Sequence, residues 1–193
     1  MGSRGGMVYC LKRVAFTPTV SPPVTDSETI DVGEIDGYVW VHVKGKGSFA
    51  GSPPLKDYLD RRINEGEKRF VVDLEACPAM DSTFMGTLAG VAMRLGRVPG
   101  GRLQLNAVNE RNREALEDLG LDVLLDIDPN ESEWRDHVET VRSRLEPLEE
   151  ESGAADAEHV LEAHRRLCEV NRQNVDKFGT VMDVLEQRVT GEQ

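Results

Sequence analysis

The feature that most constrains this chain is a regular alternation of strand-like and helix-like segments from Ile30 to about Ile127. Short apolar or alternating runs predict strands, and apolar side chains at helical spacing predict the helices between them. The predicted strands are 38–43, 70–74, 103–108 and 121–127, and the predicted helices are 55–64, 82–95 and 111–119. This order requires a largely parallel sheet, because parallel neighbours need crossover connections. We therefore predict an α/β domain over residues 30–128, with a sheet of four to five strands and helices packed on it.

Three flanking segments complete the chain. Residues 1–29 are predicted to be poorly ordered, because 17–29 is rich in Pro, Ser and Thr and offers little to bury. Residues 129–152 are predicted to hold one connecting helix followed by an acidic linker. Residues 153–193 follow a helical pattern and are predicted to form one long amphipathic or coiled-coil helix, a helical C-terminal extension of the domain.

The charge balance excludes some classes of partner. The 193 residues hold 23 Lys and Arg against 35 Asp and Glu, which gives a net charge of −12. Binding to nucleic acid or to an anionic membrane depends on clustered basic side chains, so we expect neither as a partner. Three widely separated cysteines, Cys10, Cys77 and Cys168, are expected to be free thiols of a reducing compartment. With no apolar stretch long enough to span a membrane, we expect a cytoplasmic protein.

The most informative stretch is 70–91, FVVDLEACPAMDSTFMGTLAGV. A buried strand leads to Asp81, a favourable N-cap residue, and Ser82 and Thr83 then fall in the first turn of a helix. That turn has unpaired backbone N–H groups and the positive end of the helix dipole, so a phosphate is favoured there. Small residues are expected to let the backbone of this helix approach the sheet closely, namely Gly86, Ala89, Gly90 and Ala92.

This stretch resembles the signature of the STAS domain, the family of bacterial anti-sigma factor antagonists, in which a strand is followed by Asp-Ser-Ser/Thr-Gly-Leu-Gly. The resemblance covers residues 30 to about 128 and includes the helix–Gly–strand pattern LEDLGLDVLL at 116–125. It implies a STAS-like fold. The chain departs from the signature at Phe84, which replaces the first glycine, and at Met85, which replaces the leucine, whereas Gly86 matches. A bulky aromatic in the first turn is expected to reshape the surface that a partner grips.

In the family, an anti-sigma factor serine kinase phosphorylates the serine directly after the aspartate, and a PP2C-type phosphatase reverses the modification. Carried onto this chain, the resemblance makes Ser82 the expected phosphoacceptor, with Thr83 as the alternative. It makes the expected partner-binding residues Asp81, Ser82, Thr83, Phe84 and Met85. The protein would then be an anti-sigma factor antagonist-like switch in a partner-switching system. Three other interpretations stay open: a segment that only caps a helix, a STAS scaffold that is never phosphorylated, and a STAS domain that senses a small ligand.

The C-terminal segment contains a heptad seam, defined by ten residues with spacings of 4 and 3 in turn: Ala157, Leu161, His164, Cys168, Asn171, Val175, Phe178, Met182, Leu185 and Val189. Such a seam is typical of a coiled coil. It predicts a homodimer through Leu161, Cys168, Val175, Phe178, Met182 and Leu185. The alternative is a helix folded back on its own domain, which Gly179 favours because glycine weakens a helix by about 1 kcal/mol relative to alanine.

No other motif predicts catalysis or a bound cofactor. His164 and Cys168 share a helix face at i, i+4, but a zinc site needs further ligands that the segment does not convincingly supply. The loop 44–48 lacks the spacing of a phosphate-binding loop. We therefore expect no enzyme activity, no metal and no cofactor.

Overall fold

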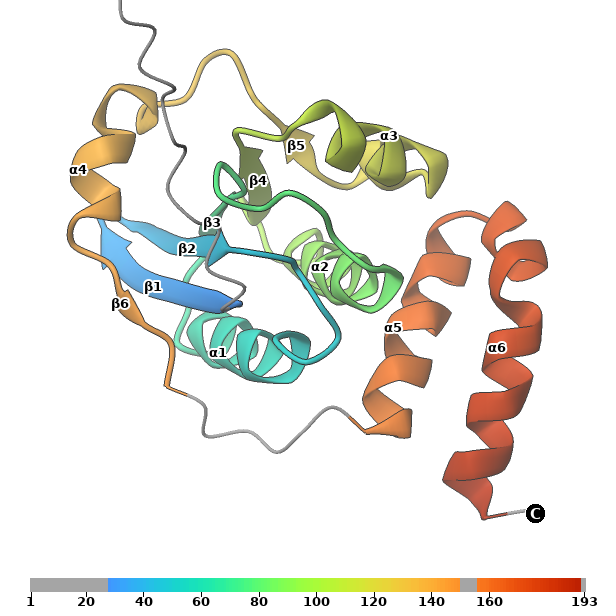
Figure 1. The fold of residues 1–193 in the computed structure, drawn as a ribbon. Coiled ribbons are helices and arrows are strands. Elements are labelled where there is room, and N and C mark those ends of the chain that lie inside the picture. The colour runs from blue at the N-terminus through green and yellow to red at the C-terminus, as the bar shows by residue number, and fades with distance from the viewer. Residues whose placement is uncertain (1–27, 150–155, 192–193) are drawn as a thin grey trace, which may run out of the picture.

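The computed structural model of the protein describes residues 28–149 and 156–191 (Figure 1). The described part is a six-stranded sheet with three helices packed on one face, and two C-terminal helices lie outside that helical layer. The prediction of poor order for residues 1–29 falls almost wholly outside the described residues, as do Cys10 and the acidic linker after residue 149.

The strands are β1 (Thr29–Ile35), β2 (Tyr38–Lys44), β3 (Arg69–Asp73), β4 (Arg102–Asn106), β5 (Asp126–Ile127) and β6 (Glu146–Pro147), in the order β5-β4-β3-β2-β1-β6. β2 to β5 pair in parallel, whereas β1 and β6 are antiparallel additions. The sheet therefore has six strands rather than the predicted four to five. Asp36 and Gly37 both adopt positive φ, 53° and 72°, which suits a two-residue hairpin turn and folds β1 onto β2. The short β6 then pairs with the outer edge of β1.

The three helices that connect the parallel strands lie on one face of the sheet. They are α1 (Ser52–Asn64), α2 (Ser82–Leu95) and α3 (Glu110–Asp118). From β2 to β5 each parallel strand is added to the same edge of the sheet, so right-handed crossovers place all three helices on the same face. Alternate strand residues point towards the helices and form the main core, which includes Val39, Val41, Val43, Phe70, Val72, Leu103 and Leu105.

The last parallel strand is shorter than predicted. Gly120 has φ 71° and ends α3, and the chain then forms a 3-10 turn, η1 (Leu121–Val123). Only Asp126–Ile127 pairs with β4, although a strand was expected over 121–127. Leu121 and Leu125 are buried in the main core from the turn, so their apolar pattern reflects a packed turn and not a strand.

The opposite face of the sheet is covered by residues 131–145, which we call the α4 segment. Its Trp134 packs edge-on against Trp40 of β2, with ring centroids 5.4 Å apart. Arg142 donates two hydrogen bonds, of 2.6 and 3.0 Å, to the carboxylate of Asp73 at the end of β3. The single connecting helix predicted here is replaced by η2 (Arg135–His137), α4 (Val138–Arg142) and β6, because these contacts hold the chain against the sheet.

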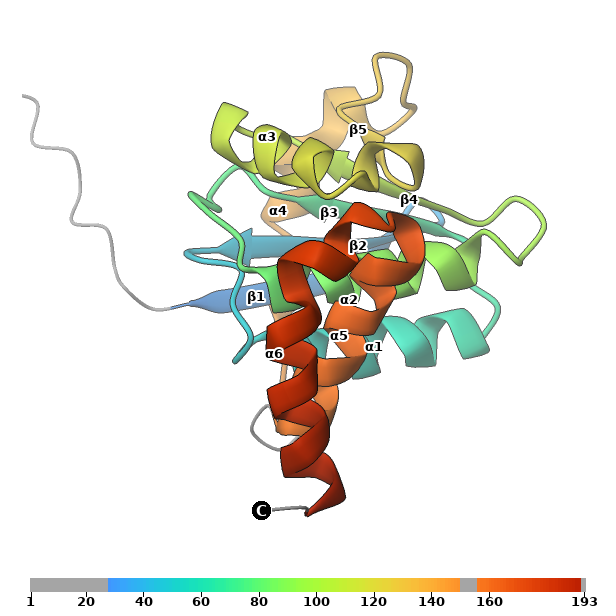
Figure 2. The same cartoon turned by 90° about the vertical axis from the view of Figure 1, so that its right-hand side faces the viewer.

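The C-terminal segment is not the one long helix that its pattern predicts. It forms α5 (Ala157–Val170) and α6 (Gln173–Thr190), which fold back on each other as a hairpin (Figure 2). The break falls at Asn171, whose backbone is extended at φ −139° and ψ 121°. The buried Asn174 stabilises the break by donating to the carbonyl oxygens of Leu119 at 3.0 Å and Leu167 at 2.8 Å. Contact with the end of α3 thus turns the chain where a continuous helix was expected.

The heptad seam closes within this hairpin. The ring of His164 on α5 packs edge-on against Phe178 on α6, 4.8 Å between centroids, and the sulfur atoms of Cys168 and Met182 lie 3.8 Å apart. Cys77 and Cys168 are free thiols. Within residues 28–149 and 156–191, no helix is long and apolar enough to cross a membrane.

Candidate functional site: the start of helix α2

Asp81 fixes the start of α2. Its backbone is extended, and its carboxylate accepts a hydrogen bond of 2.9 Å from the N–H of Phe84 in the first turn. The second carboxylate oxygen accepts a bond of 2.8 Å from the N–H of Phe49, in the loop between β2 and α1. Both oxygens are therefore used inside the domain, and Asp81 joins this loop to the helix that carries Ser82.

The first turn of α2 separates the five expected partner-binding residues into two groups. Thr83, Phe84 and Met85 are buried, whereas Asp81 and Ser82 are half-exposed. The Phe84 ring belongs to the main core and lies under the loop at Gly47, where an added Cβ atom would be 2.9 Å from its Cδ1. The aromatic that departs from the family signature therefore points inward, and the expectation that it reshapes the surface is corrected. Of the two expected phosphoacceptors, only Ser82 reaches the surface.

The hydroxyl of Ser82 is engaged by the C-terminal hairpin. Its Oγ lies 3.0 Å from Nε2 of His164 on α5. Nδ1 of the same ring lies 2.8 Å from the carbonyl oxygen of Val160. A carbonyl oxygen only accepts, so Nδ1 carries a proton; in the neutral ring Nε2 then accepts the hydrogen of the serine hydroxyl. No carboxylate among the described residues bonds to His164, so the pair lacks the orienting acid of a hydrolytic triad.

Helix α5 crosses α2 one turn after Ser82. A Cβ atom added to Gly86 would lie 2.7 Å from the carbonyl carbon of Ala163 and nearer still to its oxygen. The two backbones can approach this closely only because residue 86 has no side chain. At Gly90, one turn further, an added Cβ would meet only the side chain of Arg166, at 3.4 Å. The small residues Gly86 and Gly90 thus allow α5 to approach α2 closely. The sequence had suggested that they allow α2 to approach the sheet.

The family description of the STAS domain matches residues 29–134, more than half of the chain. The chain belongs to the STAS domain family. Similar solved structures are an anti-sigma factor antagonist from Mycobacterium paratuberculosis (25% identity, TM-score 0.48, 61% of this chain and 96% of that one), protein TM1081 from Thermotoga maritima (19%, 0.49, 58% and 94%), and the Bacillus cell fate determinant SpoIIAA in its phosphorylated form (18%, 0.45, 58% and 99%). A search of curated proteins found no match.

The match confirms the family predicted from residues 70–91 and 116–125. It also shows that the C-terminal hairpin lies outside the family's domain. The STAS domain ends at residue 134 in the match, whereas the hairpin begins at Ala157. The Ser82–His164 contact therefore joins the STAS domain to a segment beyond it. His164 was assigned from the sequence to the heptad seam alone, and nothing in the sequence pairs two residues 82 positions apart.

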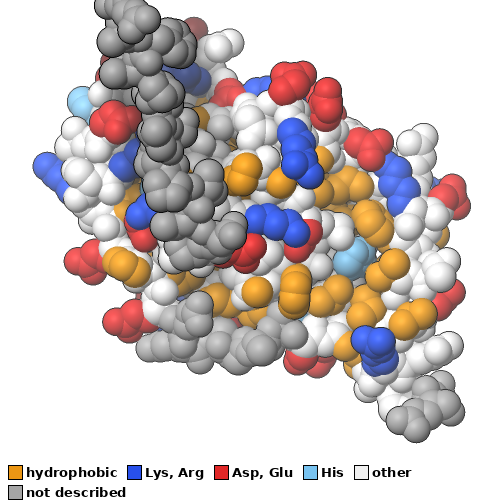
Figure 3. Space-filling view, viewed as in Figure 1, with side chains coloured by type: hydrophobic (Ala, Val, Ile, Leu, Met, Phe, Trp, Pro, Cys, Tyr) orange, Lys and Arg blue, Asp and Glu red, His pale blue; other side chains and the backbone are white. Residues whose placement is uncertain are grey.

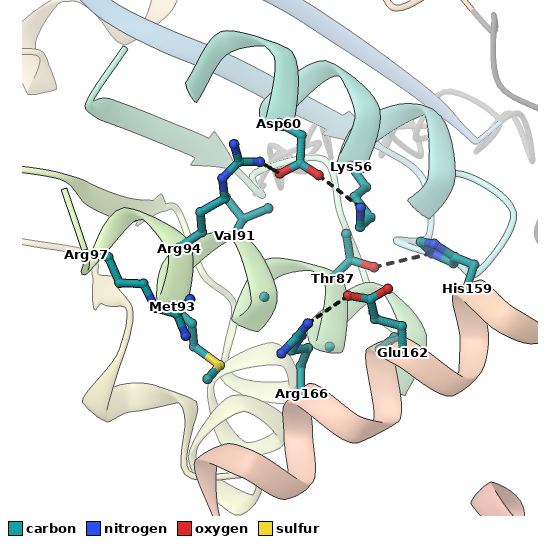
Figure 4. A pocket seen from close by; sticks show the side chains of 13 residues that line it. Lys56, Asp60, Thr87, Val91, Met93, Arg94, Arg97, His159, Glu162 and Arg166 are labelled. Carbon is teal, nitrogen blue, oxygen red and sulfur yellow. Dashed lines mark hydrogen bonds and ion pairs between the residues drawn. The ribbon is translucent and has the colours of Figure 1, made fainter. Parts of the chain in front are cut away.

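A hollow of about 300 Å³ opens beside this crossing, between α1, α2 and α5 of the STAS domain and hairpin (Figure 4). Its rim is charged, but the charges pair: Lys56 and Arg94 both contact Asp60, and Arg166 contacts Glu162. Arg97 is the one basic side chain of the rim, among the described residues, without an ion pair. The rim therefore carries four basic side chains against two acidic ones, a net charge of +2.

His159 lies at the edge of this hollow, with Nε2 3.5 Å from the hydroxyl of Thr87. Burial lowers the pKa of His159 below its ordinary value of 6.5, and the charge of Lys56 lowers it further. Asp156 and Glu162 oppose that shift. The uncharged imidazole is therefore the form that suits the docked hairpin.

Proposed function

We propose that the protein is an anti-sigma factor antagonist-like switch of the cytoplasm, controlled by reversible phosphorylation of Ser82. An anti-sigma factor serine kinase would bind at the start of α2 and transfer phosphate to Ser82, and a PP2C-type phosphatase would remove it. The chain itself catalyses no reaction in this proposal. The observation that carries it is the position of Ser82, the half-exposed hydroxyl directly after the N-cap Asp81 of a STAS domain.

The chemistry of this position suits a phosphate. The unpaired N–H groups of a first helical turn and the positive end of the helix dipole favour an added anion. The same phosphate would bring close to two negative charges into a contact that must be desolvated when a protein binds, and this would break the complex. One position can therefore carry the modification and transmit it to a partner.

The proposal is tested on full-length protein recovered from its native cells. Intact mass and phosphopeptide analysis should find one phosphate on Ser82 in the wild type and none in Ser82→Ala. Thr83→Val is the matched control, because it removes the neighbouring hydroxyl without changing the side-chain volume much. Phosphate that persists in Ser82→Ala and is lost in Thr83→Val would move the site to Thr83.

Binding of the kinase gives a second test. Ser82→Asp should weaken the complex by at least about tenfold to thirtyfold, or 1–2 kcal/mol, because a charge enters a desolvated contact. Ser82→Asn, which has nearly the same shape without the charge, is the control and should retain most of the affinity. Equal losses in the two variants would show that shape, and not charge, controls the complex.

Ligand sensing is a second candidate, and the hollow beside α2 is the observation that favours it. Its volume of about 300 Å³ is at the lower end of small-molecule sites. A ligand there would contact both the STAS domain and α5. A metabolite screen followed by thermal shift of the full chain should find a compound whose stabilisation is lost in Gly90→Leu, which would fill part of the hollow.

The homodimer predicted from the heptad seam stays a prediction. Two seam pairs, His164 with Phe178 and Cys168 with Met182, face one another within one chain, whereas the seam residue Val175 is 46% exposed. A dimer would therefore use the exposed valines of α6, which include Val181 and Val184 at 43% and 46%. Light scattering of the full-length protein should then give the mass of a dimer, and Val184→Lys should reduce it to a monomer. A monomeric wild type would contradict the dimer.

A further inference from the structure

Helix α5 occupies the surface of α2 that the proposed kinase would need. We propose that the α5–α6 hairpin is an autoinhibitory cap, which holds Ser82 away from the kinase until the hairpin leaves α2. This inference rests on the proposed function and adds its regulation. It follows from three features: the bonded hydroxyl of Ser82, the crossing at Gly86, and the way the hairpin is attached.

The first feature is the state of the acceptor hydroxyl. In the docked hairpin the Ser82 hydroxyl is hydrogen-bonded to Nε2 of His164 across 3.0 Å, and His164 is itself buried and bonded to the Val160 carbonyl. A kinase active site must surround a serine hydroxyl on the side from which the phosphoryl group arrives. That space beside Ser82 is partly filled by α5. The docked state therefore protects the acceptor by position as well as by its hydrogen bond.

The second feature is the crossing itself. At Gly86 the backbone of α5 lies against the backbone of α2, so no side chain of another protein can enter between them. Apolar side chains gather on the outer surface where the start of α2 meets the hairpin (Figure 3). The hairpin therefore competes for one face of α2 with any partner that binds along Ser82, Gly86 and Gly90. Binding of one excludes the other.

The third feature is that the hairpin can separate as one unit. Its two helices are joined to each other by the seam contacts of His164 with Phe178 and of Cys168 with Met182. It contacts the STAS domain through Ala163 and Leu167 on α5, and through hydrogen bonds of His164 with Ser82 and of Asn174 with the carbonyl oxygen of Leu119. The α6 end of the attachment is the exposed Lys177, whose Nζ lies 2.7 Å from Asp118. Separation therefore leaves the seam intact and strands no ion pair inside the STAS domain.

Two variants of the full-length chain should open the cap by different routes. Gly86→Ala places a methyl group against the Ala163 carbonyl and forces α5 away from α2. Lys177→Glu sets two negative charges together at Asp118 and touches no core residue. Gly90→Ala is the matched control, because the same substitution on the same helix face meets only the flexible stem of Arg166.

Hydrogen exchange measures the opening, and phosphate occupancy at Ser82 in native cells measures its consequence. Both opening variants should exchange α5 amides at least about tenfold faster than the wild type, with unchanged exchange in β2, β3 and β4. Their phosphate occupancy at Ser82 should rise several-fold, whereas Gly90→Ala should match the wild type in both measurements. Unchanged exchange in β2 to β4 also shows that the STAS domain remains folded.

The other outcomes separate the two proposals. Faster exchange of α5 with wild-type phosphate occupancy would overturn the cap and leave the proposed function standing. Gly86→Ala and Lys177→Glu chains that both exchange like Gly90→Ala would overturn the attachment on which the cap depends. An open hairpin with no phosphate on Ser82 in any chain, the wild type included, would overturn the proposed function itself.

Discussion

Two segments attach to the STAS sheet and its helices in contrasting ways. The α4 segment is held to one face by Arg142, which binds the fully buried carboxylate of Asp73. The α5–α6 hairpin is held to α2 by a glycine crossing, the buried Leu167 and the bond from Ser82 to His164. Removing the partner of a buried charge costs much free energy, whereas packed small residues can separate without leaving a buried charge unpaired. We therefore expect the α4 segment to unfold only with the domain, and the hairpin to open first.

The largest effect should come from Arg142→Met. The variant leaves the Asp73 carboxylate buried without a positive charge beside it, bonded only by neutral donors: the amide of Asn106 at 3.0 Å and the backbone N–H of Glu75 at 3.3 Å. We expect the free energy of unfolding to fall by about 3–5 kcal/mol, measured by urea titration. Arg135→Met is the control, because that guanidinium is exposed and bonds only to carbonyl oxygens. A loss below about 1 kcal/mol for Arg142→Met would contradict the contrast between the segments.

The next effect should come from Leu167→Ala in the hairpin. Leu167 is fully buried in the main core, so truncation should cost about 2–5 kcal/mol of docking free energy. The loss should be measured as faster hydrogen exchange of α5 and α6, with a smaller change in β3 and β4. Val184→Ala, at an exposed position of α6, should change neither. Equal acceleration in the hairpin and the sheet would show one cooperative unit.

Acid should weaken both attachments. Burial is the main cause that lowers the pKa of His42 on β2, and it likewise lowers the pKa of His159 on α5. A folded-state pKa below the unfolded value means that the unfolded chain binds more protons as the pH falls, so stability is full above about pH 7 and declines below 6.5.

Titration of hairpin opening by hydrogen exchange separates the two histidines. The charged groups around His42 are Asp73, Arg142, Lys44 and Asp31, of which the first acts against the shift and the second with it. His159→Asn should remove the acid sensitivity of hairpin opening and leave that of global unfolding. An unchanged pH profile of opening in His159→Asn would assign the effect to another group.

The smallest effect should come from Arg166→Met. Both carboxylates that contact Arg166, Glu162 and Glu169, lie on α5 itself, so these ion pairs do not join the hairpin to α2. Methionine keeps the apolar stem over Gly90. We expect docking to change by less than about 0.5 kcal/mol, because exposed pairs within one helix contribute little. A larger change would mean that the charged rim of the hollow helps to hold the hairpin.

The contrast also shows where the sequence was informative. The start of α2 could be predicted because its signals are local: Asp81 caps the helix, and Ser82 follows it in the first turn. The alternation from Ile30 to Ile127 predicted the parallel strands and their helices, and family membership confirmed the interpretation. Such signals depend on residues within a few positions of one another, so the chain order contains them.

The strand count and the α4 segment were decided by distant contacts. β6 is only Glu146–Pro147, too short for any pattern, and exists because the chain returns past the edge of β1. The spacing of Trp134, Val138 and Val141 suggested a longer helix, but Trp134 packs on Trp40, far away in the sequence. Local periodicity could not show that competing contact.

The sequence alone determined that one face of the C-terminal segment is apolar, and that Ser82 begins a helix. Only the tertiary structure decided what covers that face and what meets that serine. The apolar side chains of a heptad seam can be buried against a second chain or against the same chain turned back, because the hydrophobic effect depends only on the apolar area removed from water. The turn at Asn171 and the contact of Asn174 with Leu119 select the second arrangement, and they bring His164 to Ser82.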